Sequence, residues 1–123
     1  MKKSFDQMPV LPPTGFSHRA KVLRVLDGDT VEAEIYPIIG TTMTWHLRFE
    51  GINAPEIHGP SQPLGQAAKT FLETLLPVGT AITLLIHKLD KYGRGLAQVY
   101  LADGRCVNRL MLDAGQAVEY WLD

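Results

Sequence analysis

The chain has 123 residues, enough for one domain with a single hydrophobic core. Apolar residues make up 46% of the sequence and charged residues 20%, the balance of an ordinary globular protein. The net charge of −1 argues against a general nucleic-acid coat protein, which carries a basic footprint, but agrees with an enzyme that grips one phosphate locally. Cys106 is the only cysteine, which excludes an internal disulfide and a cysteine metal cluster.

The N-terminal segment, residues 1–17, is predicted to be a flexible proline-rich tail, because its prolines interrupt any regular element. Lys2 and Lys3 are followed by Asp6 and prolines rather than by an apolar run, so we expect no signal peptide and no membrane partner. The expected location is cytoplasmic or unknown. Residues 18–123 are expected to form the folded domain.

Three strands are predicted in the first half of the domain. Residues 18–26 have β-like composition and end at the turn signal Asp27-Gly28. Residues 31–35 alternate apolar and charged side chains, as a half-buried strand does. Residues 43–50 alternate in the same way, which predicts one apolar face and one polar face, the latter formed by Thr44, His46, Arg48 and Glu50.

The second half is predicted to contain a helix over residues 64–75, strands over 82–86 and 97–101, and a short helix over 107–114. Pro63 suits the first turn of the longer helix, and Gly115 is placed to cap the end of the shorter one. The predicted order is three strands, a helix, two strands and a helix, and its first part, three strands, a helix and two more strands, is the element order of the OB-fold. We therefore predict a mainly β fold with α-helices (α+β), a five-stranded OB-type barrel with two or more helices.

Three short strings hold the residues that suit phosphodiester chemistry: Asp27 to Thr30, Arg48 to Glu56, and Asp90 to Gly95. The two arginines, Arg48 and Arg94, can hold phosphate oxygens in a bidentate fork and offset charge building at phosphorus. The acidic first string suits a hard divalent cation, and Glu56 can take a proton from water. Taken singly, each residue also has a plainer interpretation, as a hairpin turn, a solvated arginine or an idle loop carboxylate.

In this order the strings resemble those of the staphylococcal nuclease homologues over residues 21 to 117. The resemblance rests on these anchors: Val25 to Val31, Leu47-Arg48, Ala54-Pro55-Glu56, Gly65 with Ala68, Asp90 to Ala97, and Asp103 to Asn108. It implies an OB-type barrel. It also implies a calcium-dependent nuclease that hydrolyses DNA and RNA, prefers single strands and leaves 3′-phosphate ends.

The resemblance assigns catalytic roles to three residues: Arg48 and Arg94 grip the phosphate, and Glu56 orients or deprotonates the attacking water. One calcium ion would be held by Asp29, Asn53 and the backbone carbonyl of Ala54. Asn53 departs from the family pattern, which usually has an aspartate there. An amide oxygen can still bind calcium, but the lost charge predicts weaker affinity.

The resemblance further implies that Lys91 and Tyr92 contact the nucleotide beside the scissile phosphate. Tyr120 is expected to stack on a base, although Tyr120 and Trp121 could equally pack the chain end on the barrel. We expect a monomer that acts on single-stranded DNA or RNA. Two alternatives stay open: a catalytically weak or inactive module that binds nucleic acid or protein, and an accessory domain cut from a larger protein.

Overall fold

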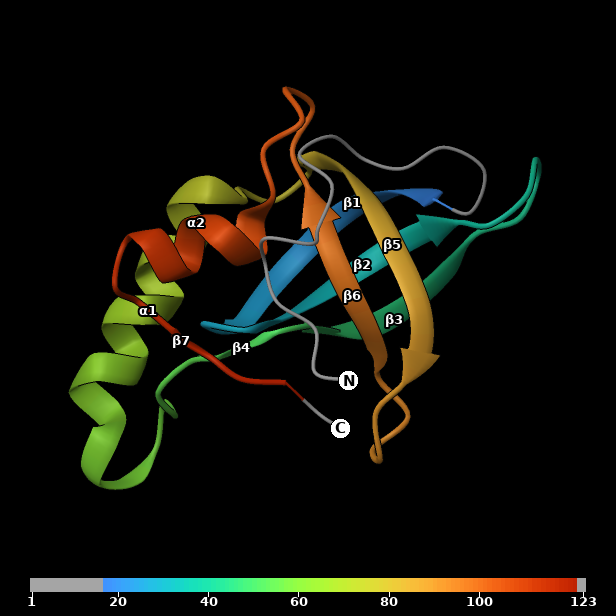
Figure 1. The fold of residues 1–123 in the computed structure, drawn as a ribbon. Helices are drawn as coiled ribbons and strands as arrows, with labels where there is room; N and C mark the ends of the chain where they lie inside the picture. The colour runs from blue at the N-terminus through green and yellow to red at the C-terminus, as the bar shows by residue number, and fades with distance from the viewer. Residues whose placement is uncertain (1–16, 122–123) are drawn as a thin grey trace.

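A computed structural model describes residues 17–121, apart from the side chain of His87. Of the predicted tail, only Ser17 lies within the described residues, where it begins the first strand. Five strands close into a barrel in the order β1-β2-β3-β6-β5 (Figure 1). Their bounds are β1 Ser17–Asp27, β2 Thr30–Tyr36, β3 Met43–Phe49, β5 Ala81–Leu89 and β6 Gly95–Tyr100. The predicted five-stranded barrel of OB type is confirmed.

The barrel closes through one parallel pair, β3 with β6, while the other neighbouring strands run antiparallel. In the parallel register Arg48 lies opposite Leu96, two residues after Arg94. A parallel pair needs a long crossover connection. Here the chain between β3 and β6 supplies it, with a helix and strand β5 on the way. Closure therefore brings two distant stretches of sequence together at one rim of the barrel.

Two helices, α1 Gln62–Leu75 and α2 Val107–Asp113, lie together on one side of the barrel (Figure 1). A short 3-10 turn, Gly59–Ser61, precedes α1. Pro63 stands in the first turn of α1 and Gly115 follows α2 with a φ of 72°, as predicted. The apolar face of α1 contributes Ala68 and Leu72 to the core. No helix in the described part of the chain is long and apolar enough to cross a membrane.

The sequence did not predict a second, two-stranded sheet. It pairs β4, Ile52–Asn53, with β7, Val118–Glu119. Two-residue strands are too short to show an alternating pattern, so no periodic signal could reveal them. The backbone N–H of Tyr120 also donates to the carbonyl of Gly51 at 2.8 Å. These contacts hold the chain near residue 120 beside the segment that follows β3.

The polar face predicted for β3 is wrong at Glu50, which is 3% exposed. Strand β3 ends at Phe49, and Gly51 then turns the chain with a φ of 83°, so the alternation does not continue through Glu50. The backbone N–H of Glu50 donates to the carbonyl of Ala97, and its carboxylate accepts a hydrogen bond from Gln98. Hydrogen bonds of this kind are what a buried charge requires.

Candidate active site

Asp29 is the second residue of the two-residue turn between β1 and β2. Its backbone N–H donates to Asp27 Oδ1 at 3.0 Å, and its Oδ2 accepts the backbone N–H of Ala54 at 2.8 Å. A side chain at Gly28 would stand 2.7 Å from the Cβ atoms of both Ala54 and Ala68, closer than carbon atoms approach. Glycine at position 28 thus lets the acidic turn lie against the Ala54 loop.

Arg48 connects Asp29 to Asn53. Its Nη2 lies 3.4 Å from Asp29 Oδ2 and 3.2 Å from Asn53 Oδ1, while its Nη1 donates to the carbonyl of Phe49 at 2.8 Å. One guanidinium nitrogen therefore lies between two of the predicted calcium ligands. The Arg48 guanidinium thus places positive charge at the position where the family resemblance implies a calcium ion.

Asp29 is buried, and that burial raises the pKa of its carboxyl group from 3.8 to about 6. The contact with Asp27 acts in the same direction. The Arg48 guanidinium and the hydrogen bond from the Ala54 amide lower the pKa, but by less than burial and Asp27 raise it. The ionised carboxylate is thus short of positive charge, which a bound cation would supply.

The side chains near Arg48 offer a small set of hard oxygen donors. They are one carboxylate, at Asp29, and one amide oxygen, at Asn53. Within residues 17–121 no group of three or more His, Cys, Asp or Glu side chains lies close enough together to hold a metal. This set fits a hard cation that keeps several water molecules or takes substrate phosphate oxygens as further ligands.

Asp90 organises the loop that carries Arg94. Its Oδ1 accepts the backbone N–H groups of Tyr92 and Arg94, both at 2.9 Å, and its Oδ2 accepts Arg94 Nε at 2.6 Å. Burial acts to raise the pKa of Asp90, but the hydrogen bonds from Arg94 and Tyr92 prevail and lower it. Trp45 Nε1 donates to the carbonyl of Gly93 at 2.9 Å, which ties this loop to β3. Asp90 and Trp45 were not among the predicted site residues.

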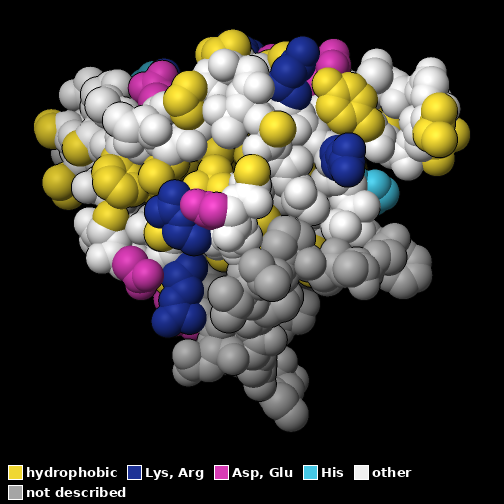
Figure 2. Space-filling model, turned by 90° about the horizontal axis from the view of Figure 1, so that it is seen from above, with side chains coloured by type: hydrophobic (Ala, Val, Ile, Leu, Met, Phe, Trp, Pro, Cys, Tyr) yellow, Lys and Arg dark blue, Asp and Glu magenta, His cyan; other side chains and the backbone are white. Residues whose placement is uncertain are grey.

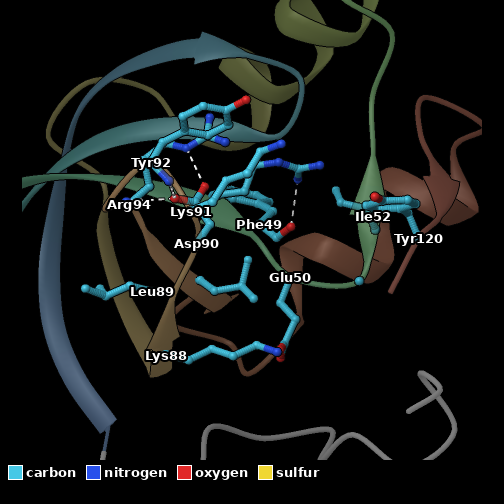
Figure 3. A pocket seen from close by; sticks show the side chains of 13 residues that line it. Phe49, Glu50, Ile52, Lys88, Leu89, Asp90, Lys91, Tyr92, Arg94 and Tyr120 are labelled. Carbon is cyan, nitrogen blue, oxygen red and sulfur yellow. Dashed lines mark hydrogen bonds and ion pairs between the residues drawn. The ribbon is translucent and has the colours of Figure 1, made fainter. Parts of the chain in front are cut away.

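A pocket of about 470 Å³ brings together five predicted residues: Arg48, Lys91, Tyr92, Arg94 and Tyr120 (Figure 3). Tyr92 is 71% exposed and its ring lies 5.1 Å from Lys91 Nζ and 5.2 Å from Arg94 Cζ. Cations stacked on an aromatic ring suit a phosphate with an unpaired base beside it. Trp121, by contrast, is buried and packs on the core.

The pocket lining leaves out Asp29, Asn53, Ala54 and Glu56. The Glu56 side chain is exposed, while its backbone is closely packed under α1. A Cβ atom on Gly65 would lie 2.0 Å from the carbonyl oxygen of Glu56, and Ser61 Oγ donates to the same oxygen at 3.3 Å. The start of α1 thus positions the backbone of Glu56.

The sequence matches the model of the staphylococcal nuclease homologue family over residues 46–122, more than half of the chain. The chain belongs to this family. The matched segment contains Arg48, Glu56 and Arg94 and begins after Asp29. The fold and the clustering of both arginines in one pocket agree with this membership.

Several curated relatives carry endonuclease names. The chain is 36% identical over 100 residues to an uncharacterized endonuclease of Escherichia coli O157:H7, covering 81% of this chain and 60% of that protein. It is 32% identical over 130 residues to endonuclease YhcR of Bacillus subtilis strain 168, covering 98% of this chain and 10% of that protein. The chain therefore spans only part of the length of these family members.

Proposed function

We propose that this chain is a metal-dependent nuclease that hydrolyses phosphodiester bonds of DNA and RNA. The observation that carries the proposal is that Arg48 and Arg94 line one pocket, with Arg48 Nη2 3.4 Å from the buried Asp29 carboxylate. The family membership and the names of the relatives support the same reaction.

Each predicted residue has a task in this reaction. Arg48 and Arg94 bind the phosphate and offset the charge that develops on its oxygens. Glu56, exposed in its loop, orients a water molecule or accepts its proton. Asp29, Asn53 and the carbonyl of Ala54 would hold calcium. When bound, the cation adds positive charge beside the phosphate and makes bound water a better nucleophile.

We further propose a preference for single strands, with 3′-phosphate ends as products. The exposed rings of Tyr92 and Tyr120 support the first part, because both border the pocket and bases stack on aromatic rings only when they are unpaired. The second part rests on the family resemblance.

The test is incubation of the protein with single-stranded DNA, single-stranded RNA and duplex DNA, with calcium or with excess chelator. We expect cleavage of the single strands with calcium and none with chelator. Enzymatic labelling of the product ends identifies the position of the phosphate. Full activity in chelator would contradict the metal requirement.

Arg94→Ala and Glu56→Ala should each lower turnover by ~10²–10⁴-fold, the usual contribution of one such group. Arg105→Ala is a matched control, because Arg105 Nε contacts Asp103 Oδ2 at 2.8 Å in a turn like that of Arg94 but outside the pocket. Glu73→Ala, on an exposed face of α1, is the control for Glu56. If either variant loses less than about threefold in turnover, the substituted residue does not have the role assigned to it.

A binding module is the second candidate, and the position of Glu56 outside the pocket lining favours it. A groove that holds phosphate but lacks a well-placed base would bind single strands without cutting them. Tight binding of single-stranded DNA with no cleavage at any calcium concentration would support this candidate and reject the nuclease.

A further inference from the structure

A second, smaller hollow of about 230 Å³ shares Asn53 and Ala54 with the candidate active site. Its lining comes from two segments that are far apart in the sequence, residues 53–55 and residues 115–118. The pairing of β4 with β7, in which Asn53 lies opposite Val118, holds these segments together (Figure 1). We call this space the β7 hollow, and the pocket of about 470 Å³ that contains both arginines the phosphate pocket.

Asn53 connects the β7 hollow to the phosphate pocket. Its side chain accepts a hydrogen bond from Arg48 Nη2 at 3.2 Å, and Arg48 lines the phosphate pocket. The short sheet borders both spaces as well: Ile52 and Tyr120 line the phosphate pocket, whereas Asn53 and Val118 line the β7 hollow. A phosphate held by Arg48 would therefore lie close to both spaces.

The β7 hollow suits an uncharged group. Within the described part of the chain, the residues that line it carry no charge: Asn53, Ala54, Pro55, Gly115, Gln116, Ala117 and Val118. It is thus no second phosphate site, in contrast to the phosphate pocket with its lysines and arginines. Its volume lies below the roughly 300 Å³ at which pockets for drug-sized ligands begin. One base or one sugar is a group of the right size.

Two side chains of the β7 hollow can hold a base of any type. Val118 is 64% exposed, although its backbone is fixed by the pairing with β4, so it offers apolar surface that a base can cover. The Gln116 side chain has an amide group, which can donate to or accept from the edge of a base. Neither contact distinguishes one base from another.

We propose that the β7 hollow is a second nucleoside subsite, for the nucleoside on the opposite side of the scissile phosphate from Tyr92. A strand would place one nucleoside at the exposed tyrosines, its phosphodiester at Arg48 and Arg94, and the next nucleoside against Val118. The phosphodiester is then held in position from both sides. This inference rests on the proposed function, because it takes the phosphate pocket to hold the scissile phosphate.

The first experiment locates the bound nucleosides by NMR titration of the protein in excess chelator, which prevents cleavage. The probes are three phosphodiesters of equal charge. Thymidylyl-thymidine has a nucleoside on both sides of its phosphate, whereas the methyl esters of thymidine 3′-phosphate and thymidine 5′-phosphate have one. One of the two esters should shift the backbone amide signals of Tyr92 and Arg94 only. The dinucleotide should shift those of Gln116 and Val118 as well.

Two results of this titration overturn the proposal. The first is a dinucleotide that leaves the amide signals of residues 115–118 unchanged. The second is a shift of these signals to the same extent by both methyl esters, because each ester lacks one of the two nucleosides.

Val118→Ser removes apolar surface from the β7 hollow and leaves the charge beside the phosphate unchanged. The dinucleotide should bind about fivefold more weakly to this variant, and the ester that occupies only the phosphate pocket should bind within about twofold of wild type. Val78→Ser is the matched control, because Val78 is 78% exposed between α1 and β5 and lines neither space. An equal effect of Val118→Ser on both probes overturns the proposal. If this variant fails to fold, the titration of the wild type decides.

Cleavage with calcium separates this inference from the nuclease proposal. On single-stranded DNA, Val118→Ser should lower kcat/KM about fivefold, and Val78→Ser should leave it unchanged. If the wild type cuts and Val118→Ser keeps the full kcat/KM, the subsite is wrong and the nuclease stands. If the dinucleotide occupies both spaces but no calcium concentration gives cleavage, the subsite stands and the nuclease is wrong.

Discussion

At the scale of single residues, Asp29 lowers the stability of the folded protein at neutral pH. Its pKa of about 6 lies above the usual 3.8, so the folded chain binds this proton more tightly than the unfolded chain. Stability is therefore lost as pH rises from about 4 to about 6. The shift in pKa corresponds to a free energy of unfolding that is about 3 kcal/mol lower above pH 6 than below pH 4.

Asp29→Asn should remove this loss. In chelator the variant should unfold at higher denaturant concentration than the wild type at pH 7.5. The difference should shrink toward pH 4. Urea unfolding at several pH values measures the effect, with Asp113→Asn as a control because Asp113 is exposed on α2. If the free energy of unfolding depends on pH in the same way in the wild type and in Asp29→Asn, the prediction is wrong. The same variant should lose activity, since it loses a proposed cation ligand.

Asn53→Asp addresses the other proposed ligand. It adds a charged oxygen where Arg48 Nη2 already lies 3.2 Å from the side chain, so the metal-free variant should fold as stably as the wild type. A second carboxylate near Asp29 should strengthen calcium binding. Calcium should then raise the melting temperature of the variant at lower concentration. A variant that needs as much calcium as the wild type would exclude position 53 from the cation site.

At the scale of secondary-structure elements, α1 positions the Glu56 loop by close contact at Gly65. Alanine in place of glycine usually stabilises a helix by ~1 kcal/mol. At Gly65 the added Cβ would collide with the Glu56 carbonyl, 2.0 Å away, and backbone cannot yield as a side chain can. Gly65→Ala should therefore destabilise the protein by about 1–3 kcal/mol and lower activity.

Thermal unfolding and turnover together test this contact. Thr70→Ala is the matched control, because Thr70 is exposed on the same helix and alanine there should be neutral or slightly stabilising. A Gly65→Ala variant that melts at or above the wild-type temperature would show that α1 is not packed on Glu56 in solution.

The elements and their closure into a barrel could largely be predicted from the sequence, but the short second sheet could not. Alternation identified β2 and β3, helical spacing identified α1, and Gly115 marked the end of α2. The two-residue strands β4 and β7 give no periodic signal. Glu50 appeared to extend the polar face of β3, because a strand's last residue is not visible in its pattern.

Some residues of the candidate site could be predicted from the sequence, and others could not. Arg48 and Arg94 stand out because arginines next to acidic strings suit phosphate, and the structure places both in one pocket. Asp90 begins one of the three strings, but its own role was not predicted, because that role depends on the turn that lets it accept three hydrogen bonds. Residue type suggests chemistry, whereas the partner of a residue depends on packing.

At the scale of the whole molecule, positive charge is local rather than general. Figure 2, which views the molecule from the side opposite the Asp90–Arg94 loop, shows Lys and Arg side chains interspersed with Asp and Glu side chains. The net charge is −1. Nucleic acid should thus gain electrostatic attraction chiefly from the cations of the pocket.

This arrangement predicts a weak salt dependence of binding. With Arg48, Lys91 and Arg94 contacting phosphate, the logarithm of affinity for single-stranded DNA should fall with the logarithm of salt at a slope of about −2. Fluorescence anisotropy between 50 and 200 mM salt should show a loss of roughly 15-fold. Lys91→Gln should flatten the slope, and Lys69→Gln, on α1, should not. A slope steeper than about −5 would reveal a second basic surface.

The parallel pairing of β3 with β6 also sets the moment at which the site comes into being during synthesis. Arg48 lies on β3 and is made before Arg94 and Tyr120, which complete the lining of the pocket. A ribosome-bound chain that exposes β1 to β3 alone has one of the two pocket arginines, Arg48, and no pocket. For a protein proposed to cut RNA, the order of translation thus keeps the growing chain inert beside its own messenger and the ribosome.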